Sequence, residues 1–203
     1  MALPSAERGR VTRERLLDAA AALIAEVGWG SVTTRLVAER AGVQAGLVHY
    51  HFSSLPALRT EAAVRVARRV LDEALMVLTT APDVPSGIDR LLAALQPYTG
   101  TDPASLLMVE ALLASTREER LRGELAAVLA DARAAVAGWL SQHGRLAQAD
   151  ATAVVLTAAL DGLVLHRAVD PSLDLASLGG PLRRLLTEAK PGMGEPFPGK
   201  EEQ

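Results

Sequence analysis

Apolar residues recur every three or four positions along most of the 203-residue chain, which is the spacing that one face of an α-helix produces. This spacing predicts helices over residues 12–27, 33–41, 44–52, 55–78, 87–95, 103–115, 117–143, 148–169 and 175–189. Glycine and proline separate the segments, as at Gly28, at Gly42 and at the two prolines between residues 79 and 86. Because the sequence has no alternating strand pattern and no internal repeat, it predicts an all-α protein of about nine helices.

The two short helical patterns between Thr33 and Phe52 are separated only by the tripeptide Ala41-Gly42-Val43. Thr33 is expected to cap the first helix by accepting a hydrogen bond from an amide of its first turn. Gly42 is expected to end that helix, because glycine adopts the left-handed conformation of a tight turn at little steric cost. Val48 and Phe52, four positions apart, would anchor the second helix inward. The pattern predicts a helix-turn-helix.

The side of the second short helix opposite its anchors combines polar, aromatic and small apolar side chains, which suits contact with a DNA groove. These outward residues are Gln44, Ala45, Leu47, His49 and Tyr50. Gly46 removes a side chain where this helix approaches something closely, either the preceding helix or a phosphate group. His49 and His51 diverge on a helix, so we do not expect them to bind a metal ion together.

The segments on either side of the helix-turn-helix have simple predicted roles. Residues 1–11 contain two arginines but no apolar periodicity, and they form either a mobile arm that follows DNA phosphates or a solubilising terminus. Thr12 is expected to cap the helix that follows, and Trp29 to pack against that helix as core. Ser53 or Ser54 is expected to cap a long connecting helix.

Composition limits the possible classes of protein. With 49% hydrophobic and 22% charged residues, the chain can bury more than a helix-turn-helix unit. Ten arginines face six acidic residues through Arg69, whereas eleven basic residues face eighteen acidic ones beyond it, an asymmetry typical of a DNA-binding segment joined to another domain. Cysteine is absent, which excludes disulfides and thiol catalysis. Without an eighteen-residue apolar run or an apolar signal core, we expect a cytoplasmic protein that has no membrane segment.

The residues around the helix-turn-helix form a longer pattern, made up of Gly28-Trp29, Thr33, Val37-Ala38, Ala41-Gly42-Val43, Gly46, Val48, His49 and His51-Phe52. This pattern resembles the DNA-binding signature of the TetR family of one-component transcriptional regulators. The match lies in the N-terminal quarter of the chain and covers about twenty-five positions, so it is far more specific than a lone helix-turn-helix. The sequence departs from the family's common pattern at Gln44, where Ser or Thr is usual, at His49, where Tyr is usual, and at Leu55, where a phosphate-binding Lys is common.

The resemblance implies an N-terminal helix-turn-helix domain over residues 1–54 and a C-terminal helical domain for ligand binding and dimerisation over residues 55–190. Residues 191–203, rich in Pro and Gly, are expected to be a disordered tail. We expect the contacts to DNA phosphates to come from Thr33, Thr34, Arg35, Tyr50 and His51. We expect the base edges to be contacted by Gln44, Ala45, Leu47 and His49, with Gly46 at the closest approach.

The last two long helices carry more apolar surface than one small core needs, and their small residues allow close helix packing. In the resembled family, the last two helices of each subunit form a four-helix interface. Two DNA half-sites one turn apart, near 34 Å, can be bound together only by two helix-turn-helix units held in fixed register. We therefore expect a homodimer whose interface contains Val155, Ala159, Gly162, Leu163, Leu182 and Leu186.

The C-terminal region also contains candidates for a cavity that binds a small apolar effector, namely Met76, Leu91, Leu95, Tyr98, Met108, Glu110, Trp139, His143 and His166. Met and aromatic side chains adapt to irregular apolar molecules. The alternative is that the apolar members form a closed core, because helical apolar stripes are usually packing. The polar members are then exposed or hydrogen-bonded within the fold.

The sequence thus predicts a DNA-binding transcriptional regulator, namely a homodimeric repressor that a small molecule releases from a palindromic operator. The sequence does not distinguish this repressor from an activator or a ligand-independent regulator with the same DNA-binding domain. The alternative class is a helical small-molecule-binding or scaffold dimer whose DNA-binding unit is vestigial. No catalytic motif is present, Asp161 and His166 are too poorly aligned on one helix to form a catalytic pair, and we expect no cofactor and no metal.

Overall fold

The computed structural model describes residues 5–144 and 148–187, and every regular element within them is a helix. The α-helices are α1 (Ser5–Val27), α2 (Thr34–Ala41), α3 (Ala45–His51), α4 (Leu55–Thr79), α5 (Val84–Ala94), α6 (Pro103–Ser115), α7 (Glu119–Gly144), α8 (Ala149–Val169) and α9 (Gly179–Thr187). Two short 3-10 helices, η1 and η2, cover Trp29–Ser31 and Leu175–Leu178. The predicted all-α fold is confirmed, whereas the predicted tail over 191–203 lies outside the described residues.

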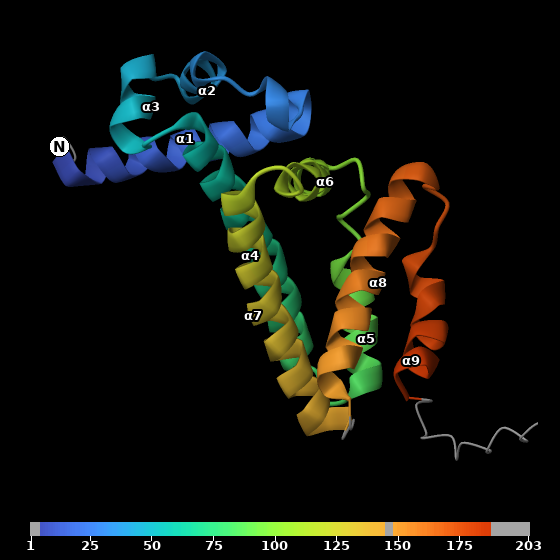
Figure 1. Ribbon diagram of the computed structural model, residues 1–203. Coiled ribbons are helices and arrows are strands. Elements are labelled where there is room, and N and C mark those ends of the chain that lie inside the picture. The colour runs from blue at the N-terminus through green and yellow to red at the C-terminus, as the bar shows by residue number, and fades with distance from the viewer. Residues whose placement is uncertain (1–4, 145–147, 188–203) are drawn as a thin grey trace, which may run out of the picture.

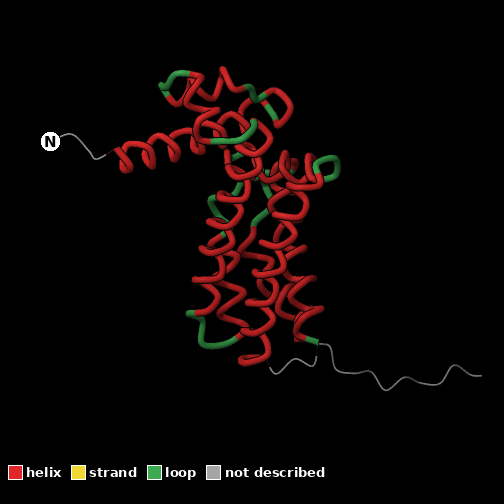
Figure 2. The backbone as a smooth tube through the Cα atoms, turned by 60° about the vertical axis from the view of Figure 1, so that its left-hand side comes forward, coloured by secondary structure: helices red, strands yellow, loops and turns green. Residues whose placement is uncertain are grey.

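Helices α1, α2 and α3 form a small unit that lies across one end of a bundle of longer helices (Figure 1). Helix α4 leaves this unit and runs along the bundle beside α7, while α5, α8 and α9 form its other side. Helix α6 lies at the end of the bundle nearest the small unit, where it packs against α1 and α4. The same two-part arrangement, with short connections between helices, is seen from a second direction (Figure 2).

Short polar side chains start most of the helices that position the two parts. The Thr33 hydroxyl accepts a hydrogen bond from the Leu36 amide at 3.2 Å, and the Ser54 hydroxyl accepts one from Ala57 at 3.2 Å. Asp83 and Asp102 cap α5 and α6 in the same way, and both of these helices have a proline in the first turn. These residues satisfy amides that the helix itself leaves unpaired, so the local sequence fixes where each helix begins.

Helix α1 begins at Ser5, so the prediction of a mobile arm followed by a cap at Thr12 is wrong for residues 5–11. The Thr12 hydroxyl donates to the Arg8 carbonyl at 2.9 Å, a bond made within a continuing helix. An ion pair between Arg10 and Glu7, three positions apart, supports this exposed first part of the helix. The sequence pattern missed it because a helix that projects into solvent needs no apolar face.

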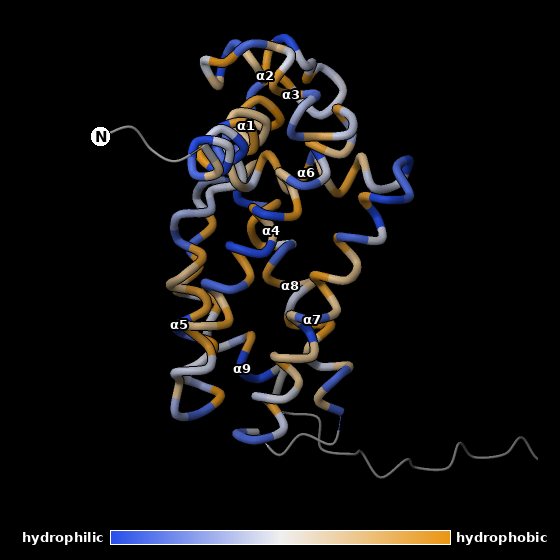
Figure 3. Tube along the Cα trace, turned by 90° about the vertical axis from the view of Figure 1, so that its left-hand side faces the viewer, coloured by the Kyte–Doolittle hydropathy of each residue, from blue (hydrophilic) through white to orange (hydrophobic). Residues whose placement is uncertain are grey.

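The buried side chains form two clusters. The first joins α1, α2, α3 and the upper half of α4 to α6 and the beginning of α7, with Leu16, Leu58 and Leu121 among its fully buried members. The second joins the lower ends of α4 and α7 to α5, α8 and α9. Hydrophobic stretches occur in both parts of the molecule (Figure 3). Because the first cluster crosses from the small unit into the bundle, the small unit does not sit on a flexible linker.

Helix α8 is unusual among the described helices because it is apolar and yet little of it is buried within the chain. It is the one described helix that is long and apolar enough, by length and composition, to cross a membrane. Val155 is 60% exposed, and Val154 and Leu165 are also exposed. An apolar helix surface of this size requires something to cover it.

Candidate nucleic-acid interface and effector cavity

The turn between α2 and α3 follows the prediction made from its glycine. Gly42 has φ of 63° and ψ of 40°, and its amide donates back into the last turn of α2. The Val43 amide donates to the Ala38 carbonyl at 2.9 Å, and the Arg15 guanidinium donates to the Ala41 carbonyl from α1. These bonds satisfy the carbonyls that a helix leaves unpaired at its end, so the angle between α2 and α3 is held by backbone geometry.

Helix α3 has one face in the core and one in solvent. Val48 is buried, and so is Phe52, which ends the helix and has the Arg13 guanidinium over its ring, 4.8 Å from the ring centre. The outer face is exposed at Gln44, Ala45, Gly46, Leu47, His49 and Tyr50, and Tyr50 is 80% exposed. His51 is half-buried, with its ring edge-on to that of Tyr50 at 5.0 Å. Thr33 and Arg35 are exposed and Thr34 is half-exposed at the start of α2.

Gly46 has two predicted roles, and its surroundings distinguish them. A Cβ atom built at this position would have no neighbour within 4 Å. The alternative in which Gly46 lets α3 approach the preceding helix is therefore wrong. The space beside Gly46 is open, so only a surface outside the described chain can require the missing side chain.

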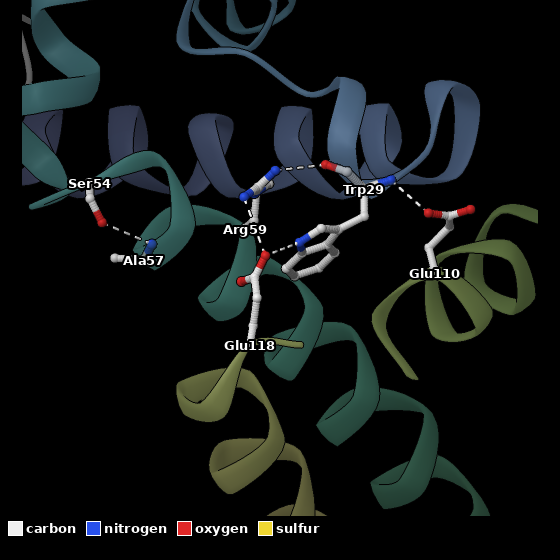
Figure 4. Close-up of polar contacts among 6 residues, drawn as sticks. All are labelled: Trp29, Ser54, Ala57, Arg59, Glu110 and Glu118. Atoms are coloured by element: carbon white, nitrogen blue, oxygen red, sulfur yellow. Dashed lines mark hydrogen bonds and ion pairs between the residues drawn. The ribbon is translucent and has the colours of Figure 1, made fainter. Parts of the chain in front are cut away.

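Trp29 lies where the small unit meets the bundle, and residues from three parts of the bundle hold it (Figure 4). Its backbone amide donates to Glu110 of α6 at 2.7 Å, and its indole N–H donates to Glu118, just before α7, at 2.7 Å. Its carbonyl accepts from Arg59 of α4 at 2.8 Å. Arg59 also pairs with Glu118 at 3.5 Å and lies over the indole ring, 5.2 Å from its centre. We call these four residues the Trp29 cluster.

The chain reaches this position through Gly28, whose φ of 83° is left-handed. This conformation ends α1 and turns the Trp29 amide toward Glu110. A Cβ at Gly28 would already lie 3.4 Å from the Glu110 carboxylate. The glycine, the indole and the two carboxylates therefore form one joint between the end of α1 and helices α4, α6 and α7.

A cavity of about 130 Å³ lies in the bundle below this joint. On α4 its wall covers 67–71, which begins at Ala67, the last member of the first buried cluster on this helix. On α7 it covers 125–129, which includes Leu125 and Val128 of the same cluster. The cavity therefore borders the first cluster on the side that faces the second. Helix α6, the C-terminal half of α8 and the connection after α5 complete the wall, which is almost entirely apolar.

Three of the nine residues predicted for an effector pocket, Leu95, Tyr98 and Met108, line this cavity. Leu91 and Trp139 do not, because they are buried in the second cluster. Met76 points into solvent, at 64% exposure. For these three residues the prediction failed because apolar periodicity identifies a buried or apolar face and not an empty one.

The predicted polar pocket residues lie elsewhere too. Glu110 holds Trp29 and faces away from the cavity wall. The His143 ring stacks on Trp139 with centres 4.9 Å apart and contacts the Trp139 carbonyl through Nδ1 at 3.0 Å. His166 is exposed on α8. Each is thus satisfied within the fold or open to solvent, as the alternative reading held.

Asp161 is the charged residue on the cavity wall, a position that its sequence spacing from His166 did not indicate. It is exposed and also on the cavity wall, so it lies where the cavity opens. The loss of water around the carboxyl raises its pKa, an effect that the nearby Arg133 guanidinium opposes. The available signal was a carboxylate in the middle of a 21-residue helix that is otherwise mostly apolar.

The residues predicted for a dimer interface divide into three groups. Val155 is exposed, and Ala159, Gly162 and Leu163 of α8 are partly exposed. Leu182 of α9 is only 8% exposed because it packs into the second cluster of its own chain, so it does not offer a free surface. The side chain of Leu186 lies outside the described residues.

Two family models match this sequence. The model for bacterial regulatory proteins of the tetR family matches residues 16–62, and the tetracyclin repressor-like C-terminal domain matches residues 82–190. The second match alone covers more than half of the chain. The chain belongs to the tetR family. Members of this family bind DNA and form dimers, and this chain is a DNA-binding transcriptional regulator.

Individual relatives support the same assignment to the tetR family. An uncharacterised HTH-type transcriptional regulator of Mycobacterium tuberculosis is 25% identical over 196 residues, 93% of this chain and 99% of that protein. A solved structure from Streptomyces coelicolor A3(2), described as a transcriptional regulator, is 27% identical with a TM-score of 0.73, over 87% of this chain and 98% of that one. The multidrug binding protein EbrR, complexed with imidazole, is 28% identical with a TM-score of 0.64, over 85% and 88%.

The contacts of the Trp29 cluster predict that alanine substitutions at two adjacent glutamates change the free energy of unfolding by very different amounts. Glu118→Ala leaves the indole N–H of a buried tryptophan without an acceptor, which costs about 1–3 kcal/mol of the free energy of unfolding. Glu119→Ala removes an exposed side chain that pairs only with Arg122, and it changes the free energy of unfolding by less than about 0.5 kcal/mol. Urea unfolding of the two variants measures the difference. Equal effects would mean that the Glu118 contact does not stabilise the joint.

Proposed function

We propose that this chain is a homodimeric repressor that a small apolar molecule releases from a palindromic operator. The observation that carries the proposal is the double role of α6. One face of α6 lines the cavity through Met108 and Leu112, and another holds the Trp29 amide through Glu110. A single short helix therefore contacts both the cavity and the DNA-binding domain.

This double contact supports a simple route for release. A molecule larger than this cavity of about 130 Å³ must displace part of its wall, because the bundle around it is close-packed. If α6 shifts, Glu110 shifts with it, and the end of α1 follows because the Trp29 amide is bonded to Glu110. The effector weakens operator binding only as far as it prefers the shifted arrangement over the one that fits DNA.

The DNA contacts that we propose follow the exposed face of the helix-turn-helix. Gln44, Ala45, Leu47 and His49 would contact base edges, with Gly46 at the closest approach, and Thr33, Thr34, Arg35, Tyr50 and His51 would contact phosphates. Open space around Gly46 and the high exposure of Tyr50 support this assignment. The half-buried His51 contributes only the edge of its ring that remains in solvent.

The exposed apolar surface of α8 supports dimer formation. Val154 and Val155 are exposed, and no side chain of the described residues crowds Gly162, so a second α8 can pack closely there. Two copies joined in this way would hold two helix-turn-helix units in fixed register for two half-sites. A partner helix that covers this surface also accounts for a helix this apolar. We propose that the regulator acts in the cytoplasm and that it catalyses no reaction.

The EbrR structure supports a small-molecule effector, because that relative is described as a multidrug binding protein and holds imidazole. One observation favours the alternative of a scaffold with a vestigial DNA-binding unit. Leu55, at a position where the family commonly has a phosphate-binding lysine, packs against the first buried cluster. Any phosphate contact at this point must come from backbone amides.

Tyr50→Ala tests the DNA-binding proposal. Gel-shift titration uses the DNA upstream of the protein's own gene, with excess non-specific DNA and at two salt concentrations. Because Tyr50 is proposed to contact phosphate, its loss should weaken binding to all DNA sequences by about tenfold while the melting temperature stays unchanged. Met76→Ala, which removes another exposed apolar side chain at 64% exposure, should bind DNA as the unaltered protein does. If the unaltered protein shows no salt-dependent binding to any DNA, the scaffold alternative is favoured.

Val155→Glu tests the dimer. A charge placed in an apolar helix–helix interface lacks a partner, so the variant should sediment as a monomer at concentrations where the unaltered protein is a dimer. Met76→Glu introduces the same charge on an exposed position of α4 and should remain dimeric. Analytical ultracentrifugation distinguishes the two results. A dimer that persists in Val155→Glu would show that α8 is not the interface at this position.

A further inference from the structure

The cavity wall offers a ligand only one polar group that is not already bonded. The Tyr98 hydroxyl donates to Glu73 at 3.3 Å, and the Ser105 hydroxyl donates to Asp102 at 2.5 Å. These two hydroxyls and Asp161 are the polar side chains on a wall that is otherwise formed by apolar ones. A molecule in the cavity would therefore meet Asp161 as its main polar contact.

The Asp161 carboxylate has no hydrogen-bond donor or ion-pair partner within bonding distance among the described residues. Arg133 lies on the neighbouring α7 and affects Asp161 only through its charge, because its Nε donates to the Thr157 hydroxyl at 3.4 Å. Asp161 is exposed, so water can occupy its free hydrogen-bonding positions when no ligand is present, and a donor on a ligand can replace that water. This arrangement resembles a binding group more than a structural one.

We propose that the effector is an apolar molecule that carries one protonated amine or similar cationic group, and that Asp161 at the mouth of the cavity binds this group. The proposal rests on the proposed function because it takes this cavity as the effector site. The apolar part would occupy the space between Leu71, Met108, Val128 and Leu165. A cationic nitrogen can donate the hydrogen bonds that the carboxylate lacks, whereas an anionic ligand would be repelled by it.

The cavity volume suggests the size of the apolar part. A cavity of about 150 Å³ lined by apolar side chains accepts a benzene ring in another protein, so 130 Å³ suits one ring or a short branched chain. Asp161 stands at the opening, so a charged group attached to the ring by one carbon can stay partly in solvent while it contacts the carboxylate. Benzylamine, which is protonated at neutral pH, is a suitable probe, and benzyl alcohol and benzoate are its neutral and anionic counterparts.

The test is isothermal titration of the three probes into the unaltered protein, Asp161→Asn and Asp131→Asn. Asp131 is exposed on α7 and is not on the cavity wall, so Asp131→Asn makes the same change of charge elsewhere. A charge-assisted hydrogen bond should make benzylamine bind about tenfold more tightly than benzyl alcohol. Asp161→Asn should remove this preference by weakening benzylamine about tenfold and benzyl alcohol by less than about twofold, and Asp131→Asn should change neither.

Several results would overturn the proposal. These are equal affinity for benzylamine and benzyl alcohol, tighter binding of benzoate, an unchanged preference in Asp161→Asn, and no binding of any probe. Operator binding, measured on the same preparations, is a separate result. If the protein prefers the cationic probe but stays on its operator, this binding site is supported and the proposed release is contradicted. If neutral probes release the protein from its operator, the proposed function is supported and the assignment of a cationic effector is contradicted.

Stability separates a binding role of Asp161 from a structural one. Because the folded protein raises the pKa of this carboxyl, its ionised form destabilises the fold at pH 7. The exposure of Asp161 to solvent keeps this penalty small, and the penalty disappears as pH falls below the ordinary pKa. Asp161→Asn should therefore unfold at a higher denaturant concentration than the unaltered protein at pH 7 and at nearly the same concentration at pH 3. Of the groups around the cavity, Arg133 reduces this effect and Tyr98, whose pKa burial raises, stays neutral throughout. A lower stability of Asp161→Asn at pH 7 would mark a structural role.

Discussion

The arrangement of the whole molecule depends on how Trp29 is held. A tryptophan at the end of α1 brings a backbone amide, an indole N–H and a carbonyl to one place, and each is bonded to a different element of the bundle. Buried donors without acceptors are costly, so the three bonds and the burial of the indole stabilise a single position of the small unit on the bundle. The first buried cluster crosses the same junction and reinforces it. The DNA-binding helices thus move with the bundle, which is the condition for a signal to pass between them.

The packing of the helical bundle is incomplete at the cavity, and this gap has a functional consequence. Helices α4 and α7 contribute to both buried clusters, and the gap lies at the edge of the first cluster that faces the second, next to α6. Two helices take part in both the cavity wall and the Trp29 cluster, and α6 is shorter than the other, α4. Its buried Leu107 and Ala111 join it to the first cluster, and its Glu110 joins it to Trp29. Close-packed interiors respond to added volume by shifting whole elements, so a shift of α6 would carry both contacts with it.

The features that the sequence predicted correctly depend on local chemistry. The Thr33 cap, the left-handed Gly42 and the inward Val48 follow from residues within a few positions, and the pattern of residues between Gly28 and Phe52 was specific enough to identify the family. The features that it missed depend on distant residues. Trp29 and Glu118 are 89 positions apart, and nothing near either one indicates the bond. The pocket residues Leu91 and Trp139 look the same in sequence as Leu95 and Met108, because an apolar face does not reveal whether its neighbours fill the space beside it. Asp161 could have been singled out as a carboxylate in an apolar helix, but its cavity could not.

Coupling of the cavity to the DNA-binding domain through α6 can be tested without any ligand by a substitution that fills the cavity. Ala104 lies on the cavity wall on α6, so Ala104→Leu adds apolar volume there as an effector would. The measurement is the operator dissociation constant of Ala104→Leu, Glu110→Ala and the double variant, each confirmed as a folded dimer. Coupling through α6 predicts that Ala104→Leu weakens operator binding by about tenfold, and that this factor shrinks in the Glu110→Ala background because the link to Trp29 is gone. An operator affinity unchanged by Ala104→Leu, or lowered by the same factor with and without Glu110, would contradict this coupling.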